Sequence, residues 1–112
     1  MKEETYRMGG RMSIIDKLVL FKKNLNNDIP IKKMILFGSR SKGKTGKDTD
    51  IDLIIVSQKF RGLDFFKRGA KMYDYWSLRY PVDFLCYSPE EFEREKKRIS
   101  IVKQAVEEGV EI

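Results

Sequence analysis

The stretch MILFGSRSKGKTGKDTDIDLIIV, residues 34–56, decides the fold of this chain. Two apolar runs at its ends enclose residues 38–49, which are rich in glycine, hydroxyl groups and lysine. Short apolar runs bounded by glycine and polar residues are typical of strands with a buried end. The pattern predicts one strand over residues 31–37, a loop over 38–49 and a second strand over 50–57.

Further elements are predicted on both sides of these strands. Ser13 and Asp16 have the spacing of a capping box, and Ser88 with Glu91 marks the start of a later helix. The remaining prediction is a helix over 13–25, a helix over 63–79, a strand over 82–87, a helix over 88–109 broken near 98–99, and a short edge strand over 110–112. This order predicts an α/β or α+β fold in which helices flank a small mixed sheet.

Length and composition limit the chain to one domain. Its 112 residues, 41% hydrophobic and 36% charged, leave room for a single core beneath a charged surface. We expect a loose arm over residues 1–12 and a single domain over residues 13–112. No apolar run approaches the ~20 residues that span a bilayer, and the N-terminus has no signal-peptide pattern. The expected location is therefore cytoplasmic, without a membrane partner.

Two residue types exclude whole classes of chemistry. Histidine is absent and cysteine occurs once, as Cys86 in an apolar stretch that predicts a core position. Catalysis by Ser-His-Asp or Cys-His groups and zinc sites of histidine or thiolate ligands are thereby excluded. Any catalysis must use carboxylates, hydroxyl groups, lysines and arginines. The net charge of +6 favours anionic partners such as nucleotides, nucleic acid or an acidic protein surface.

Gly38 and Ser39 directly follow the first predicted strand. A glycine at this point lets the backbone turn sharply, and exposed N–H groups with the Ser39 hydroxyl can hold phosphate oxygens. Arg40 and Lys42 either bring positive charge to a polyphosphate or are plain surface charges, and the sequence favours neither. Alone, the glycine–serine pair could be an ordinary turn.

Three aspartates are candidate metal ligands. Asp50 and Asp52 are two residues apart at a strand start, so their carboxylates project to the same side. Such a pair suits Mg²⁺, and two ions ~3.5–4 Å apart support in-line displacement at phosphorus. Asp83 lies in an otherwise apolar strand. If that strand neighbours residues 50–57, Asp83 completes the set as a metal ligand or proton acceptor, the alternative being a salt bridge.

Aromatic side chains gather between residues 65 and 80. They are predicted to belong to the core or to a partner interface rather than to a base-stacking platform. Core positions are predicted in particular for Phe66, Tyr73 and Trp76.

Gly38-Ser39, ten further residues, and then Asp50-Ile51-Asp52-Leu53 resemble the DNA polymerase β-type nucleotidyltransferase superfamily. More narrowly, this spacing resembles the prokaryotic minimal nucleotidyltransferases. Thr49 stands where family members often carry serine, which keeps the hydroxyl group. The resemblance implies a polymerase β palm-like fold over residues 13–112. It also implies a set of site residues: Gly38 and Ser39 for the triphosphate, Asp50 and Asp52 for two Mg²⁺ ions, and Asp83 as third carboxylate.

The resemblance further implies a biological setting. Minimal nucleotidyltransferases are commonly encoded beside a helical HEPN-domain ribonuclease, as a toxin–antitoxin pair, and can transfer AMP from ATP to a tyrosine of the toxin. We therefore expect a Mg²⁺-dependent nucleotidyltransferase that uses ATP or another nucleoside triphosphate and whose site a HEPN-type partner completes. The alternatives are an antitoxin that acts by association alone and a nucleic-acid-binding protein. The second is disfavoured because basic and acidic residues are interspersed. The oligomeric state, a homo-oligomer included, stays open.

Overall fold

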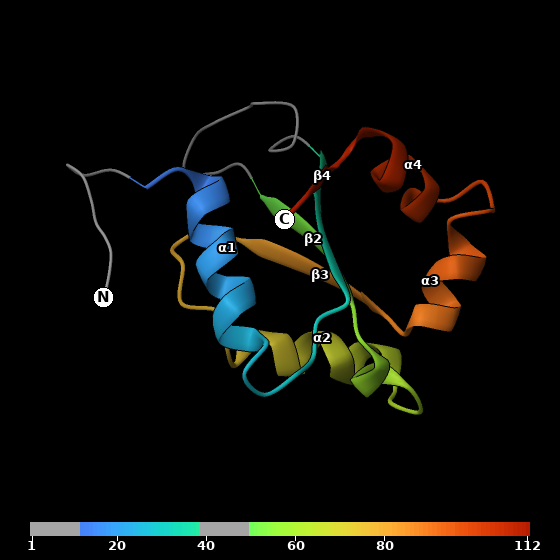
Figure 1. Cartoon of the computed structure of the whole chain (residues 1–112), viewed down its shortest axis with the longest axis horizontal. Helices are drawn as coiled ribbons and strands as arrows, with labels where there is room; N and C mark the ends of the chain where they lie inside the picture. The colour runs from blue at the N-terminus through green and yellow to red at the C-terminus, as the bar shows by residue number, and fades with distance from the viewer. Residues whose placement is uncertain (1–11, 39–49) are drawn as a thin grey trace.

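The computed structural model describes residues 12–38 and 50–112 (Figure 1). The predicted arm over 1–12 thus lies outside the described residues except for Met12. The elements are α1 (Ile14–Leu25), β1 (Lys33–Phe37), β2 (Ile51–Val56), the 3₁₀ turn η2 (Gln58–Phe60), α2 (Phe65–Tyr73), β3 (Val82–Tyr87), α3 (Pro89–Glu95), α4 (Ile101–Glu108) and β4 (Val110–Glu111). The predicted order of helices and strands is confirmed, including the break between α3 and α4.

The strands form a mixed sheet in the order β3-β2-β1-β4. β1 is antiparallel to both β2 and β4, whereas β2 and β3 are parallel. A parallel pair needs a crossover, which η2 and α2 provide between β2 and β3. The predicted small mixed sheet is thus confirmed, with β4 as its short edge strand.

Helices cover both faces of this sheet, as Figure 1 shows. On one face, Leu18, Phe21 and Leu25 of α1 join Met72 of α2 over the strands. On the other face, α3 and α4 contribute Phe92, Val102 and Ala105. The strands therefore read as nearly continuous apolar runs, because both of their faces are buried. Among the described residues, no helix is long and apolar enough to cross a membrane.

Both predicted capping boxes are present. The Ser13 hydroxyl accepts the N–H of Asp16, whose carboxylate accepts the N–H of Ser13. Ser88 and Glu91 form the same reciprocal pair at the start of α3. Each box satisfies two N–H groups that the first helical turn leaves without a partner, so the helix starts are local properties of the sequence.

The predicted helix over 63–79 is too long. α2 starts after Asp64, whose carboxylate accepts the N–H groups of Phe66 and Lys67, and it ends at Tyr73. The chain then turns so that Trp76 packs edge-on against Phe21 and Phe84, with ring centroids 5.0 and 5.7 Å away. Packing of this one large ring against the core ends the helix despite its continuing periodicity.

The predicted core positions of the aromatic residues are only partly correct. Trp76 is half-buried against the core, but Phe66 is 82% exposed and Tyr73 is 49% exposed. The Tyr73 ring packs on Phe84, and its hydroxyl donates a hydrogen bond to the Val82 carbonyl. The prediction for Cys86 is confirmed, since its thiol is buried and burial raises its pKa to about 12. Such a thiol is an inert core group.

α2 covers the outer edge of β3. Tyr73 hydrogen-bonds to the Val82 carbonyl and Arg68 to the Cys86 carbonyl. Between them, a Cβ added at Gly69 would stand 3.8 Å from the carbonyl oxygen of Phe84. The exposed edge of a sheet is a template for pairing with another chain, so α2 both satisfies this edge and protects it.

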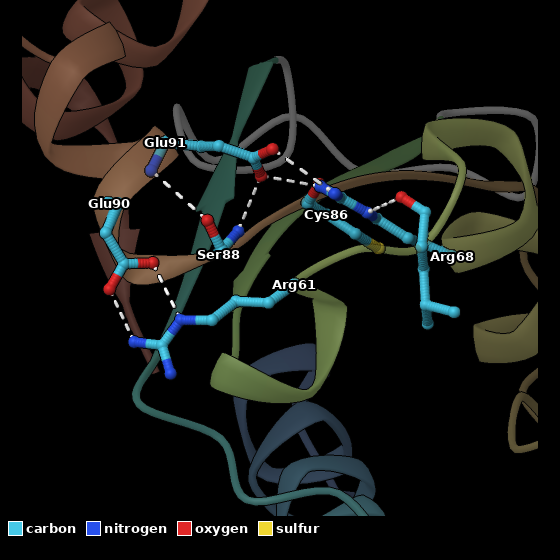
Figure 2. A network of polar contacts seen from close by, with 7 residues as sticks. Arg61, Arg68, Cys86, Ser88, Glu90 and Glu91 are labelled. Atoms are coloured by element: carbon cyan, nitrogen blue, oxygen red, sulfur yellow. Dashed lines mark hydrogen bonds and ion pairs between the residues drawn. The ribbon is translucent and has the colours of Figure 1, made fainter.

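Arg68 is 4% exposed and joins three elements (Figure 2). Its guanidinium donates hydrogen bonds to the carbonyl oxygens of Leu63 and Cys86, 3.0 and 3.1 Å away. It also forms a two-pronged ion pair with Glu91, at 2.6 and 3.2 Å. The buried arginine thereby fixes the first turns of α2 against the end of β3 and the start of α3.

Replacing Arg68 by alanine is expected to lower the free energy of unfolding by about 3 kcal/mol. Removing the buried guanidinium leaves the partly buried Glu91 carboxylate uncompensated, and the buried Cys86 carbonyl and the part-buried Leu63 carbonyl lose their donor. Arg61 is the matched control, because it forms a similar two-pronged pair with Glu90 on the exposed surface. Arg61→Ala should change stability little, since surface pairs contribute little. Urea unfolding of both variants measures the difference, and equal effects would contradict this account.

Glu91 should make the stability depend on pH in the acid range. The hydrogen bonds from Arg68, followed by the one from the Ser88 N–H, lower the pKa of Glu91 below its ordinary value of 4.5, although burial opposes them. A lowered pKa in the fold contributes stability that is present above about pH 4.5 and is lost as the pH falls through the folded-state value. Unfolding followed from pH 6 down to about pH 3 should therefore depend less on pH in Glu91→Gln than in the wild type. If Glu91→Gln showed the same pH dependence as the wild type, the stabilising role of the Arg68–Glu91 ion pair would be contradicted.

Candidate active site

The parallel register places Asp52 of β2 directly beside Asp83 of β3. Neighbouring strands lie ~4.8 Å apart, and side chains two residues apart share a face. Asp52 therefore projects with Ile54 onto the face of the sheet that α3 and α4 cover, and Asp83 projects with Leu85 onto the same face. Asp83 is exposed and Asp52 is half-buried, so α3 and α4 do not fully cover this face of the sheet at the two aspartates.

The electrostatics of Asp52 show that three carboxylates share one region. Burial, followed by the negative charges of Asp83 and Asp50, raises the pKa of Asp52 above its ordinary value of 3.8. Each of these causes disfavours the ionised form, unlike the situation of a carboxylate held in a salt bridge. A cation between the carboxylates would reverse the effect. The condition on which Asp83 would join the aspartate pair, that its strand neighbours residues 50–57, is met, whereas its role as a ligand stays a prediction.

The donor set suits a hard divalent cation, but it is open. Carboxylate oxygens are the ligands that Mg²⁺ prefers, and it commonly completes its shell with water and substrate phosphates. Within the part of the chain that the structure describes, no three acidic or thiol side chains are drawn together into a ready-made metal cage. Asp50, Asp52 and Asp83 would hold such an ion together with oxygens supplied by the nucleotide.

Gly38 stands at the end of β1, next to Asp52. Its backbone has a φ of +76°, a conformation that residues with a side chain rarely adopt. The preceding residue, Phe37, pairs with Asp52 in the antiparallel register of β1 and β2. A Cβ added at Gly38 would lie 2.5 Å from Oδ2 of Asp52. Only glycine allows this close approach. The other residues predicted to bind the triphosphate, Ser39, Arg40 and Lys42, lie outside the described residues.

A cleft of about 590 Å³ opens above the two aspartates. Its floor contains Asp52 and Asp83. One wall is the start of α2, with Phe65 and Phe66, and the other is a face of α4. The full lining is Phe37, Gly38, Asp52, Phe65, Phe66, Asp83, Phe84, Leu85, Ile101, Gln104, Ala105, Glu108 and Gly109. This volume is within the range of ligand sites in proteins.

The α4 wall was not predicted from the sequence. Ile101, Gln104 and Glu108 follow one another at helical spacing along it, while Ala105 packs on the sheet. The end of α4 packs closely against β1. A Cβ at Gly109 would stand 2.5 Å from the Ala105 carbonyl oxygen and 2.8 Å from that of Leu36, so this approach requires glycine. The amphipathic pattern of α4 was a usable signal for its buried side. Nothing in that pattern indicated what its other side would face.

The sequence of this chain is similar to those of known proteins. Residues 15–111 match the family model described as "Nucleotidyltransferase domain". The "Probable protein adenylyltransferase MntA" of Haemophilus influenzae is 32% identical over 100 residues, which cover 86% of this chain and 86% of that protein.

Solved structures give the same picture of the fold. The crystal structure of a "putative nucleotidyltransferase" from Sulfolobus solfataricus has a TM-score of 0.57 at 19% identity, covering 94% of this chain and 90% of the other. BolA1 from Arabidopsis thaliana has a TM-score of 0.50 at 18% identity, covering 65% of this chain and 92% of its own. At such identities the likeness concerns the fold alone. The family match and the relative show what the motif implied: the chain belongs to the nucleotidyltransferase-domain family and is an enzyme of the minimal nucleotidyltransferase type.

Proposed function

We propose that this enzyme transfers AMP from ATP to a protein hydroxyl group in a Mg²⁺-dependent reaction. One observation carries the proposal, namely that Asp52 and Asp83 lie side by side on the floor of the cleft, within the electrostatic reach of Asp50. The name of the Haemophilus influenzae relative, a protein adenylyltransferase, supports the choice of AMP and of a protein acceptor.

In the proposed reaction the AMP group passes directly from ATP to the acceptor, without a covalent intermediate on the enzyme. An acceptor oxygen forms a bond to the α-phosphorus of ATP while the bond from that phosphorus to the bridging oxygen breaks, and pyrophosphate leaves. Asp50, Asp52 and Asp83 would hold Mg²⁺, which would supply charge stabilisation to the attacking and leaving oxygens. Asp83 is exposed in the cleft, and its carboxylate would either bind this ion or accept the hydroxyl proton. The backbone of Gly38 itself lies close to the Asp52 carboxylate.

The acceptor we propose is a tyrosine of a HEPN-type helical toxin, so that the enzyme acts as the antitoxin of a pair. The described part of the cleft offers floor and two walls but leaves the rim beside Phe66 exposed. An acceptor side chain presented by a second protein can therefore reach the carboxylates from outside. The partner then contributes the remaining wall.

The position of the label in ATP tests the reaction. The purified enzyme is incubated with Mg²⁺ and the protein encoded by the adjacent gene, using ATP labelled at either the α- or the γ-phosphate. Label should reach the partner only from the α position, and removal of divalent cations by a chelator should stop it. Absence of α-label transfer, or transfer from the γ position, would refute the proposal.

Neutralisation by association alone is the second candidate, because a tight complex could also silence a toxin. Neutralisation by AMP transfer and neutralisation by association can be distinguished in cells that express the partner at toxic levels. A variant with Asp50 and Asp52 both replaced by alanine should fail to protect the cells if transfer is required. Full protection by that variant would favour association.

A further inference from the structure

Phe66 is exposed although its sequence pattern predicts a core position. It is the second residue of α2, and its N–H donates to the Asp64 carboxylate over 3.1 Å. Its ring meets that of Phe65 edge-on, with centroids 6.0 Å apart and an interplanar angle of 87°. Phe65 is held in turn by Tyr87, at 5.8 Å, and by the guanidinium of Arg68, 6.0 Å from its ring. Phe66 is therefore a large apolar ring presented to solvent on a firmly held support.

Arg68 links this support to the rest of the fold. The same side chain that contacts the Phe65 ring is buried and hydrogen-bonded to the Cys86 carbonyl and Glu91 (Figure 2). The start of α2 is thus anchored to β3 and α3. A platform of this kind keeps its position without ligand, which lowers the entropic cost of binding to it.

The opposite wall of the cleft, formed by α4, carries an uncharged side chain that can hydrogen-bond to a ligand, that of Gln104. Ile101, Gln104 and Glu108 line it in succession, and the span from the first to the last is about 10 Å along the helix. Glu108 and Gly109 lie at the Gly38 end, where α4 meets β1. Gln104 stands one turn further from that end and is exposed. None of the described residues hydrogen-bonds to its side-chain amide.

The cleft extends along β3 from the carboxylates toward the Phe65 ring that supports Phe66. Asp83 and Tyr87, the residue that contacts Phe65, are four residues apart on β3, about 13 Å. A nucleotide whose α-phosphate lies at Asp52 and Asp83 can extend its base over this distance. A base there would lie among apolar groups, because Leu85 and Ile101 line the same cleft, together with the amide of Gln104.

We infer that Phe66 stacks on the nucleobase of the bound nucleoside triphosphate and that the Gln104 amide selects adenine. This inference rests on the proposed function and assigns the residues that would recognise the base of its nucleotide. Aromatic rings stack on any base, so Phe66 provides affinity. A glutamine amide pairs in two-pronged fashion with the amino group and N7 of adenine, so Gln104 provides selectivity. Guanine has acceptors at both positions and would place one of them against the amide oxygen.

A docking surface for the partner is the other use of an exposed phenylalanine. The observations favour the base, because Phe66 lines the same cleft as the carboxylates and faces a wall with a hydrogen-bonding amide. A partner-docking role would need neither the carboxylates nor the amide nearby. The two uses differ in which substrate a variant would fail to bind.

Equilibrium binding with Mg²⁺ tests the inference, using a non-hydrolysable ATP analogue and, as a ligand without a base, inorganic tripolyphosphate. Phe66→Ala should weaken binding of the ATP analogue about tenfold or more and leave tripolyphosphate unchanged. Phe66→Trp should restore the affinity. Gln104→Leu should reduce the preference for the ATP analogue over the GTP analogue. Leu20→Ala, an equally simple truncation of an exposed apolar residue on α1, is the control and should change neither.

The outcomes separate this inference from the proposed function. If Phe66→Ala binds the analogue normally but needs more acceptor protein for the same transfer rate, the ring belongs to the partner interface and the inference is wrong. If the wild type binds tripolyphosphate as tightly as the analogue and still transfers α-label, the function stands and the base site does not. If the wild type binds neither the ATP analogue nor tripolyphosphate, both the inference and the proposed function are wrong.

Discussion

Asp52→Asn is expected to lower the rate of nucleotidyl transfer about a thousandfold while the protein stays folded. The loss has this size because asparagine removes the negative charge that, in the proposed function, would hold the cation, and electrostatic stabilisation is usually the largest single contribution to catalysis. Asp52 is the half-buried member of the carboxylate set and lies between the Gly38 turn and Asp83. The initial rate of α-label transfer from ATP measures the effect.

The same substitution should leave thermal stability unchanged or raise it. Burial and the charges of Asp83 and Asp50 raise the pKa of Asp52 in the fold. For an acid with a raised pKa, the ionised form costs stability above the folded-state value, and this cost vanishes as the pH falls below the ordinary value of 3.8. Asparagine removes the cost at neutral pH. Glu107→Gln, which makes the same change of charge on α4 outside the cleft lining, is the control and should retain activity. A fully active Asp52→Asn protein would contradict the assignment of the site.

Gly38→Ala is expected to affect both stability and activity. The positive φ of +76° costs a residue with a Cβ about 1–2 kcal/mol. In addition, the new methyl group would lie 2.5 Å from Oδ2 of Asp52, so the carboxylate must move. A displacement of about 1 Å in a catalytic group can cost about a hundredfold in rate, and we expect a loss of this order.

Gly62→Ala separates the two effects. Gly62 has nearly the same φ, +77°, but a Cβ there would meet nothing within 4 Å. Both alanine variants should therefore lose the unfolding free energy that the positive φ costs, whereas only Gly38→Ala should also lose transfer activity. Urea unfolding and the α-label assay, run on both proteins, measure this. Equal activity in the two variants would show that the close approach of Gly38 to Asp52 does not matter for catalysis.

Much of the fold could be predicted because its signals are local. The capping boxes at Ser13 and Ser88 mark helix starts through hydrogen bonds within one turn. The apolar runs of β1 and β2 and the glycine between them are equally local. The pairing of Asp52 with Asp83 depended on which strands become neighbours, and it could be stated only as a condition. The parallel register of β2 and β3 meets that condition.

The rest depended on contacts between distant residues. The end of α2 at Tyr73 follows from the packing of Trp76 against Phe21 and Phe84, which no local pattern contains. The apolar spacing of Phe66 was typical of a core residue, yet its side of α2 lies at the mouth of the cleft. The burial of Arg68 is of the same kind, because its partners come from three separate segments. Charge and hydropathy alone place an arginine on the surface.

The intact mass of the acceptor protein tests the central claim most directly. After incubation with this enzyme, ATP and Mg²⁺, the protein encoded beside it should gain the mass of one or more AMP groups on hydroxyl side chains. One pyrophosphate should be released for each group gained, and neither product should form with Asp52→Asn. An acceptor of unchanged mass, or one that gains phosphate instead of AMP, would contradict the assignment of the Asp52–Asp83 cleft as the site of adenylyl transfer.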